Sequence, residues 1–176
     1  YFTHLLNRRR SKKMEQHYIV CGLGRVGRAV CQELADCKIP FLVIDSDADK
    51  IQAANSSGWV SLLGDASEDK ILLQANIGQA RGLVCTVDTD AANLFILISA
   101  KGLNPEVEVS ARVNEDSNVK KFERAGAVHV YSPFSLLGRR IARTITRPRV
   151  LELLDVALEQ NNFDITIEEC TVSKGS

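Results

Sequence analysis

A glycine-rich turn between an apolar segment and a helical segment constrains the fold of this chain more than any other feature. Residues 18–21 run directly into Gly22-x-Gly24-x-x-Gly27, and the next apolar segment ends at Asp45, eighteen residues after the last glycine. Such glycines allow a tight turn, close approach of a pyrophosphate to the backbone, and close packing of the following helix on a sheet. The spacing therefore predicts a pocket for an adenine dinucleotide.

Six short apolar segments separated by five helical patterns predict a doubly wound α/β fold. Within the first helical pattern, Val26, Val30 and Leu34 lie on one face at intervals of four residues. Strands that alternate with helices form a parallel sheet covered on both faces, and a nucleotide turn after the first strand favours the Rossmann-like order 3-2-1-4-5-6. The predicted strands are residues 18–21, 41–44, 59–63, 83–87, 107–113 and 128–131.

The composition fits one globular domain with a short extension and argues against several functional classes. The chain has 176 residues, 45% hydrophobic content and no formal net charge, which argues against a general nucleic-acid binder. The five cysteines and three histidines lack metal-site spacing, so we expect no metal. Neither a signal peptide nor an apolar segment of about 18 residues is visible, which favours a reduced, cytoplasmic location.

The residues expected to bind the nucleotide lie in the glycine turn and at the carboxyl ends of the strands. The helix after the turn offers unpaired N–H groups to phosphates, and Arg25 is placed to bind a phosphate. Asp45 can accept two ribose hydroxyls and would repel a 2′-phosphate, which favours NAD-type or plain adenosine nucleotides over NADP. The complete predicted site is Gly22, Leu23, Gly24, Arg25, Val26, Gly27, Asp45, Ser46, Gly64, Asp65, Ala66, Thr86, Val87, Asp88 and Arg112.

Several of these assignments have structural alternatives. Asp65 can face the adenosine or cap a helix that begins near Ser67, and Arg112 can reach the phosphates or form a surface ion pair. Asp88 and Asn93 can instead cap the fourth helix. The glycine turn itself can serve packing alone, in a chain that binds nothing.

The sequence around the predicted pocket lacks the residues of a catalytic site. A dehydrogenase needs a proton donor or acceptor opposite the nicotinamide, but two histidines precede the first strand and His129 lies inside the sixth. The chain also has no Tyr-x-x-x-Lys pair and no G-x-x-x-x-G-K-[ST] loop for phosphoryl transfer. We therefore expect a binding module that is not an enzyme; the alternative is the NAD-binding part of a truncated dehydrogenase.

Two helical segments follow the sixth predicted strand, although the sheet is complete without them. The first, about residues 134–146, places Phe134, Leu137, Ile141 and Ile145 on one stripe, and the second runs from residue 150 to about residue 160. An apolar stripe of this kind requires a partner surface.

Five motifs in a fixed order give the chain a family resemblance over about residues 17–160. They are HYIVCGLGRVGR at 17–28, VIDSD at 43–47, LGDAS at 63–67, DTDAAN at 88–93 and ERAGA at 123–127. With these motifs the chain resembles the RCK, or KTN (TrkA-N), family of domains that regulate potassium conductance. The resemblance implies a Rossmann lobe at 17–132, crossover and dimerisation helices at 133–161 that pair through the apolar stripe, and a truncated C-terminal lobe that begins at 162–176.

The same resemblance suggests a ligand and partners. It implies NAD or NADH as ligand, with ATP, ADP and AMP as alternatives, and self-association of paired lobes into a ring of eight. Residues 1–16 resemble the end of a pore-lining helix and a basic linker at the cytoplasmic face of an inner membrane, although a disordered basic tail is the alternative. The expected function is the gating domain of a potassium channel; the alternatives are a detached subunit of a Trk- or Ktr-type transporter or antiporter, and a structural ring module with an empty pocket.

Overall fold

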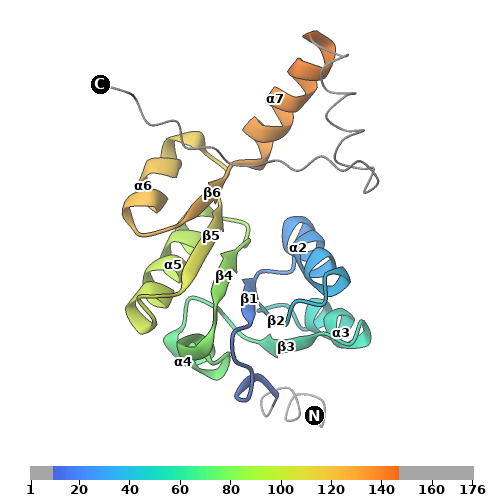
Figure 1. Cartoon of the computed structure of the whole chain (residues 1–176), viewed down its shortest axis with the longest axis vertical. Helices are drawn as coiled ribbons and strands as arrows, with labels where there is room; N and C mark the ends of the chain where they lie inside the picture. Colours follow the sequence, from blue (N-terminus) through green and yellow to red (C-terminus); the bar gives the residue numbers. More distant parts are fainter. Residues whose placement is uncertain (1–9, 147–176) are drawn as a thin grey trace, which may run out of the picture. The chain divides into compact units, whose positions relative to one another are not determined.

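The computed structural model describes residues 10–146, which divide between Ser135 and Leu136 into two units that are described separately. The first unit is built on one six-stranded sheet, parallel throughout, in the order β3-β2-β1-β4-β5-β6 (Figure 1). This order confirms the predicted fold class. The strands are β1 Tyr18–Cys21, β2 Phe41–Asp45, β3 Val60–Leu63, β4 Gly82–Cys85, β5 Glu108–Arg112 and β6 His129–Tyr131.

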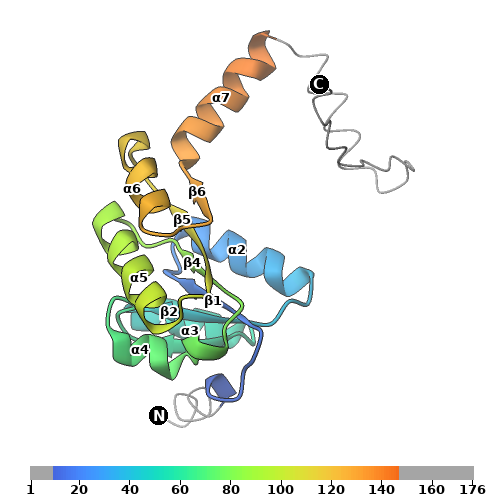
Figure 2. The same cartoon turned by 60° about the vertical axis from the view of Figure 1, so that its left-hand side comes forward.

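Helices cover both faces of the sheet, as the alternation of strand and helix patterns predicts. Helices α2 and α3 lie on one face, and α4 and α5 lie on the other (Figures 1 and 2). Among residues 10–146, no helix combines the length and the apolar character needed to cross a membrane. The helices are α2 Arg25–Asp36, α3 Ala48–Ser56, α4 Asp69–Gln74, α5 Asp90–Leu103, α6 Val119–Arg124 and α7 Pro133–Thr146, with 3₁₀ turns η1 Ile77–Gln79 and η2 Asp116–Asn118.

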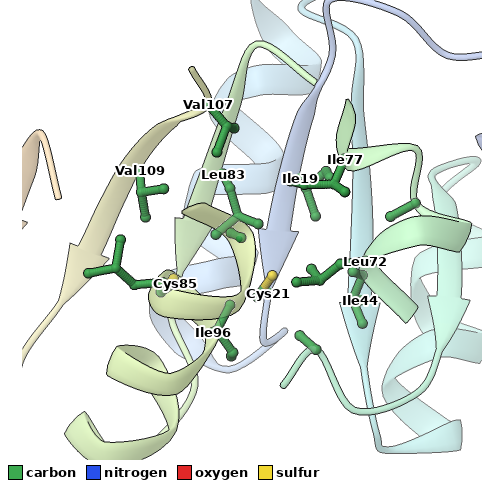
Figure 3. Close-up of a cluster of buried hydrophobic side chains, with 14 of the residues drawn as sticks. Ile19, Cys21, Ile44, Leu72, Ile77, Leu83, Cys85, Ile96, Val107 and Val109 are labelled. Atoms are coloured by element: carbon green, nitrogen blue, oxygen red, sulfur yellow. The ribbon is translucent and has the colours of Figure 1, made fainter. Parts of the chain in front are cut away.

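Alternation along the central strands divides the core into two layers. In β1, Ile19 and Cys21 belong to the layer shared with α4 and α5, whereas Val20 belongs to the layer shared with α2 and α3. Figure 3 shows the larger layer, with Cys21 and Cys85 of neighbouring strands beside Ile96 of α5. Burial raises the pKa of both thiols well above the ordinary value, so these cysteines are packing residues and not nucleophiles.

Several predicted element ends differ from the structure by one or two residues. The predicted strand 83–87 stops at Cys85, because the N–H of Val87 donates to the side chain of Asn93. Helix α6 is capped by Ala125, and the next residue, Gly126, has φ at 100°. Its N–H donates to the Glu123 carbonyl, which makes Gly126 the left-handed residue of a Schellman ending.

The segment before β1 is fastened to the corner between α4 and η1. The Ser11 hydroxyl donates to the Gln74 carbonyl at 2.9 Å, and the Asn76 amide donates to the Met14 carbonyl at 2.8 Å. Residues 10–17 and 74–79 together form what we call the amino-end clasp. Because β1 begins at the next residue, the clasp closes the amino end of the sheet, opposite the glycine turn.

A buried histidine occupies the centre of the clasp. His17 is fully buried, and its Nε2 lies 2.9 Å from the Ala75 carbonyl, which identifies Nε2 as the protonated nitrogen. Nδ1 has no hydrogen-bond partner among residues 10–146. Burial lowers the pKa of His17, and the bond to Ala75 opposes this shift only in part, so the ring is neutral in the folded chain at pH 7.

Candidate functional site

A pocket of about 470 Å³ lies at the carboxyl ends of the strands, where the strand order reverses between β1 and β4. This volume includes space that is open to solvent. Ten of the residues that line it belong to the site predicted from the sequence, and Ile44 and Lys50 are additional. The lining is Gly22, Gly24, Ile44, Asp45, Ser46, Lys50, Gly64, Asp65, Ala66, Thr86, Val87 and Asp88.

Gly22 and Gly27 of the turn are required for steric reasons, whereas Gly24 marks the start of the helix. Gly22 has φ at 95°, and a Cβ there would lie 2.8 Å from the nitrogen of Val87. A Cβ on Gly27 would lie 1.9 Å from the carbonyl oxygen of Gly22, so Gly27 lets α2 pack on the turn and does not line the pocket. Gly24 is the N-cap of α2 and supplies no side-chain bond, which leaves this positive helix end open to an anion.

The other predicted residues of the turn do not line the pocket. The side chain of Leu23 is buried in the layer under α2, although its backbone N–H takes part in the site. Arg25 is exposed and Val26 is partly buried, and both lie in the first turn of α2. The structure therefore places Gly22 and Gly24 at the pocket and leaves Gly27 and the Arg25 side chain outside its lining.

Asp45 is the most firmly held side chain of the pocket. Its Oδ2 accepts from the Leu23 N–H at 2.6 Å, and its Oδ1 accepts from the Asp47 N–H at 2.9 Å. The residue is 7% exposed, and the ammonium of Lys50 lies 3.7 Å from Oδ2. Because a carboxylate can accept about four hydrogen bonds, Asp45 keeps acceptor capacity for ligand hydroxyls while its orientation is fixed.

Lys50 is the polar residue that the sequence analysis missed at this site. It lies in the first turn of α3, five residues after Asp45, and also lies 4.0 Å from a carboxylate oxygen of Asp47. The signal available in the sequence was its place one turn into the helix after the acid. There, a side chain can reach back to the carboxyl end of β2.

The loop after β3 contributes Gly64, Asp65 and Ala66 to the lining. Asp65 accepts at Oδ1 from the Ser67 N–H at 2.8 Å, while α4 begins only at Asp69. Asp65 therefore closes the turn before α4 and does not cap the helix itself, and it also lines the pocket. The expectation that Asp65 caps a helix is therefore wrong, because α4 has Glu68 as its N-cap, and a place facing the adenosine stays a prediction.

Thr86 supports the glycine turn from behind. Its hydroxyl lies 2.9 Å from the Cys21 carbonyl and 2.8 Å from the Gly22 carbonyl, and the side chain is buried. The hydroxyl has one hydrogen to donate, and these carbonyls compete for it. Although Thr86 lines the pocket, its polar group holds the turn in place.

Asn93 supports Val87, the pocket residue that follows Thr86. It is fully buried in α5, where its side chain accepts from the Val87 N–H and donates to the carbonyls of Val87 and Arg112, each at 3.0 Å. The expectation that Asn93 caps α5 is wrong, because Thr89 is the N-cap and accepts from the Ala92 N–H. Asn93 instead joins the ends of β4 and β5.

Arg112 lies outside the pocket lining and belongs to a network at the end of β5. Its Nη2 donates to the Asn114 side chain at 2.6 Å. Nearby, Asp90 accepts from the Asn114 N–H, the Glu115 N–H and the Asn118 side chain. Burial alone would raise the pKa of Asp90, but these bonds and the Arg112 charge outweigh it and hold the pKa below the ordinary value.

The predicted dimerisation stripe lies on α7. Phe134, Leu137, Ile141 and Ile145 are each more than half exposed. Large exposed side chains at helical spacing are consistent with a surface that pairs with another chain. The second predicted helix and the start of the C-terminal lobe, at residues 150–160 and 162–176, lie outside the described residues.

The chain matches a known domain family and resembles two potassium channel proteins. The model of the TrkA-N domain family matches residues 18–133. The chain is 38% identical over 156 residues to potassium channel protein 1 of Methanocaldococcus jannaschii, covering 86% of this chain and 47% of that protein. It is 32% identical over 172 residues to the probable potassium channel protein 2 of the same organism, covering 94% and 50%. The chain therefore spans about half the length of these curated relatives.

Solved structures with the same fold come from more than one kind of transport protein. The TrkA-N domain of the inner membrane protein YbaL of Escherichia coli, a putative cation/proton antiporter, superposes with a TM-score of 0.69 at 30% identity, covering 81% of this chain and 98% of that chain. The GsuK channel bound to NAD superposes with a TM-score of 0.63 at 19% identity, covering 69% and 22%. At that identity the likeness to GsuK shows the fold alone.

Proposed function

Because the chain belongs to the TrkA-N, or RCK, family of domains, we propose that it senses an adenine nucleotide and regulates a potassium channel. The fixed carboxylate of Asp45, beside an uncapped helix end, is the observation that carries the nucleotide part of the proposal. This pairing offers a hydroxyl acceptor and an anion site within one pocket, as a nucleoside phosphate requires. The two potassium channel relatives support the channel part.

The proposed ligand is NAD or NADH, with ATP, ADP and AMP as alternatives. A ligand of this kind changes gating only through its difference in affinity between two states of the protein, commonly about 1–3 kcal/mol per coupled site. We propose that the α7 stripe pairs two copies of the chain and that paired copies form a ring of eight lobes below the pore. Several pockets in one ring would then add their effects on pore opening.

No reaction is part of this proposal. The described pocket is lined by glycines, apolar residues, carboxylates and the hydroxyl residues Ser46 and Thr86, with Lys50 as its cation, and no histidine or tyrosine lines it. The pocket therefore suits reversible binding, with the nucleotide as a signal and not as a reactant.

A second candidate is a regulatory domain of a cation antiporter or of a Trk- or Ktr-type transporter. The likeness to the YbaL domain at 30% identity supports this reading as directly as it supports the fold. Potassium flux measured in vesicles that contain the full-length protein separates the two: a channel conducts passively, whereas an antiporter exchanges potassium for protons. NAD, NADH, ATP and ADP should each be tested for an effect on that flux.

The nucleotide part of the proposal is tested by calorimetry of this chain against NAD, NADH, ATP, ADP and AMP. We expect binding of at least one nucleotide that Asp45→Ala weakens by about tenfold or more, because two ribose hydroxyls lose their acceptor. Asp49→Ala, an exposed carboxylate of the same helix region that does not line the pocket, is the matched control. Absence of binding to all five nucleotides, or equal effects of the two substitutions, would contradict the proposal.

A further inference from the structure

Carboxylates flank the glycine turn on two sides. On the β2 side, Asp45 accepts from the Leu23 N–H within the turn. On the β4 side, a carboxylate oxygen of Asp88 lies 3.9 Å from the position that a Cβ would occupy on Gly24. Both acids line the same pocket, so a phosphate at the turn lies between two hydroxyl acceptors.

The two carboxylates differ in how they are held. Asp45 is buried and bonded to backbone N–H groups, whereas Asp88 is exposed and no hydrogen bond or ion pair reaches its carboxylate within residues 10–146. The backbone of Asp88 is nevertheless fixed, because the Asn114 side chain donates to its carbonyl at 2.7 Å. The carboxylate of Asp88 therefore remains available to accept hydrogen bonds, while the backbone of the residue is fixed.

The negative charge of the pocket affects which ligand groups can lie near Asp88. Three carboxylates, those of Asp45, Asp65 and Asp88, line the pocket, with Lys50 as the cation among the described lining residues. A nucleoside diphosphate or triphosphate bound with its ribose at Asp45 would direct a terminal phosphate, with about two negative charges, toward Asp88. A dinucleotide bound in the same way would instead direct the hydroxyls of its second ribose there.

We propose that Asp88 makes the pocket selective for dinucleotides over nucleotides that end in a phosphate. The carboxylate accepts hydrogen bonds from the second ribose and repels an unesterified terminal phosphate. This inference rests on the proposed function, since it names the class of nucleotide that the same pocket takes.

ADP and ADP-ribose are the sharpest pair of probes, because they differ only in the ribose that esterifies the terminal phosphate. Calorimetry should compare the two ligands on the unaltered chain of 176 residues and on Asp88→Asn, which removes the charge at nearly constant shape. We expect Asp88→Asn to tighten ADP about three- to tenfold through loss of repulsion, and to weaken ADP-ribose by a similar factor. The two affinities thus move in opposite directions.

Two controls separate this effect from a general disturbance. Asp69→Asn, on α4 and outside the pocket lining, should leave both affinities unchanged within about twofold. Raising the salt concentration to about 0.5 M should reduce the gain for ADP, because salt screens an exposed charge pair, and should preserve the loss for ADP-ribose.

The outcomes distinguish the two proposals. If both ligands bind and Asp88→Asn leaves the ratio of their affinities unchanged, selection by Asp88 is refuted while the nucleotide pocket stands. If ADP binds the unaltered chain more tightly than ADP-ribose, selection is also refuted. If neither ligand binds either form, the nucleotide pocket itself fails and the selection fails with it.

Discussion

The two ends of the same sheet use buried polar groups for opposite purposes. At the amino end, the clasp joins backbone and side-chain groups of residues 10–17 directly to residues 74–79 and closes that end. At the carboxyl end, Thr86 bonds to carbonyls of the glycine turn and Asn93 bonds to the backbone of Val87. The glycine turn and Asp45 still line the pocket. Hydrogen bonds thus close the amino end of the sheet, whereas at the carboxyl end they support the loops and leave the pocket open.

The largest effect is expected from Gly27→Ala, which disrupts the close packing of α2 on the glycine turn at the carboxyl end. The added Cβ would lie 1.9 Å from the Gly22 carbonyl, so α2 and the turn must separate. We expect a loss of about 3 kcal/mol in the free energy of unfolding, measured by urea denaturation, together with loss of nucleotide binding.

Gly78→Ala is the matched control within the amino-end clasp. No atom lies within 4 Å of a Cβ at Gly78, and its φ is not in the left-handed region. We expect a stability change below about 1 kcal/mol, in the stabilising direction. Equal losses from the two substitutions would show that glycine loss alone, and not the contact at the turn, sets the effect.

The next largest effect is expected from Asn93→Ala, which removes the support behind the pocket wall. Three hydrogen bonds disappear, and the Val87 backbone groups lose their side-chain partner in a partly buried position. We expect a loss of about 2–3 kcal/mol in the free energy of unfolding and weaker nucleotide binding.

Asn104→Ala provides the comparison for Asn93→Ala. Asn104 follows α5, donates to the Ile77 carbonyl and accepts from the Glu106 N–H, away from the pocket lining. Here we expect a loss of about 1 kcal/mol with unchanged nucleotide affinity. Reduced affinity from Asn104→Ala would mean that binding follows global stability and not the support at the wall.

The smallest effect at neutral pH, and one that grows on acidification, is expected from His17. The pKa of His17 in the folded chain lies below its ordinary value of 6.5, so unfolding takes up about one proton in the interval between the two values. The stability that depends on neutral His17 is therefore complete above pH 6.5 and is lost as the pH falls below it. Asp90, whose pKa is lowered from 3.8, affects stability only at much lower pH.

Urea denaturation at pH 7.5 and pH 5.5 measures the His17 effect. The unaltered chain should be less stable at pH 5.5, and His17→Gln should reduce this difference, because glutamine can still donate to the Ala75 carbonyl but cannot take up a proton. A pH dependence that His17→Gln leaves unchanged would assign it to other groups.

The sheet was predictable from the sequence because its signals are local. Each central strand is a short apolar segment, and the turn Gly22–Gly27 fixes which strand is first at the reversal of strand order. The same locality explains why Gly64, Asp65 and Ala66 were found: carboxyl ends of parallel strands meet at one edge.

The remaining features depend on contacts between distant segments, which no local pattern records. Asn93 looks like a cap because it lies near a helix start, but its partners include Arg112, nineteen residues away. Arg112 has the charge expected of a phosphate ligand, yet the structure directs it to Asn114. The clasp joins residues more than fifty positions apart, and nothing in the basic stretch around Ser11 indicates that its hydroxyl is buried.

The clasp also determines how the domain would respond to a mechanical load. A pull applied at residue 10 reaches Ser11–Gln74, Met14–Asn76 and His17–Ala75 before it reaches β1, because these bonds come first along the chain. Tension is therefore delivered to the corner that follows α4 and not to the hydrogen bonds of the sheet. A force entering from this side would first act on the surroundings of His17.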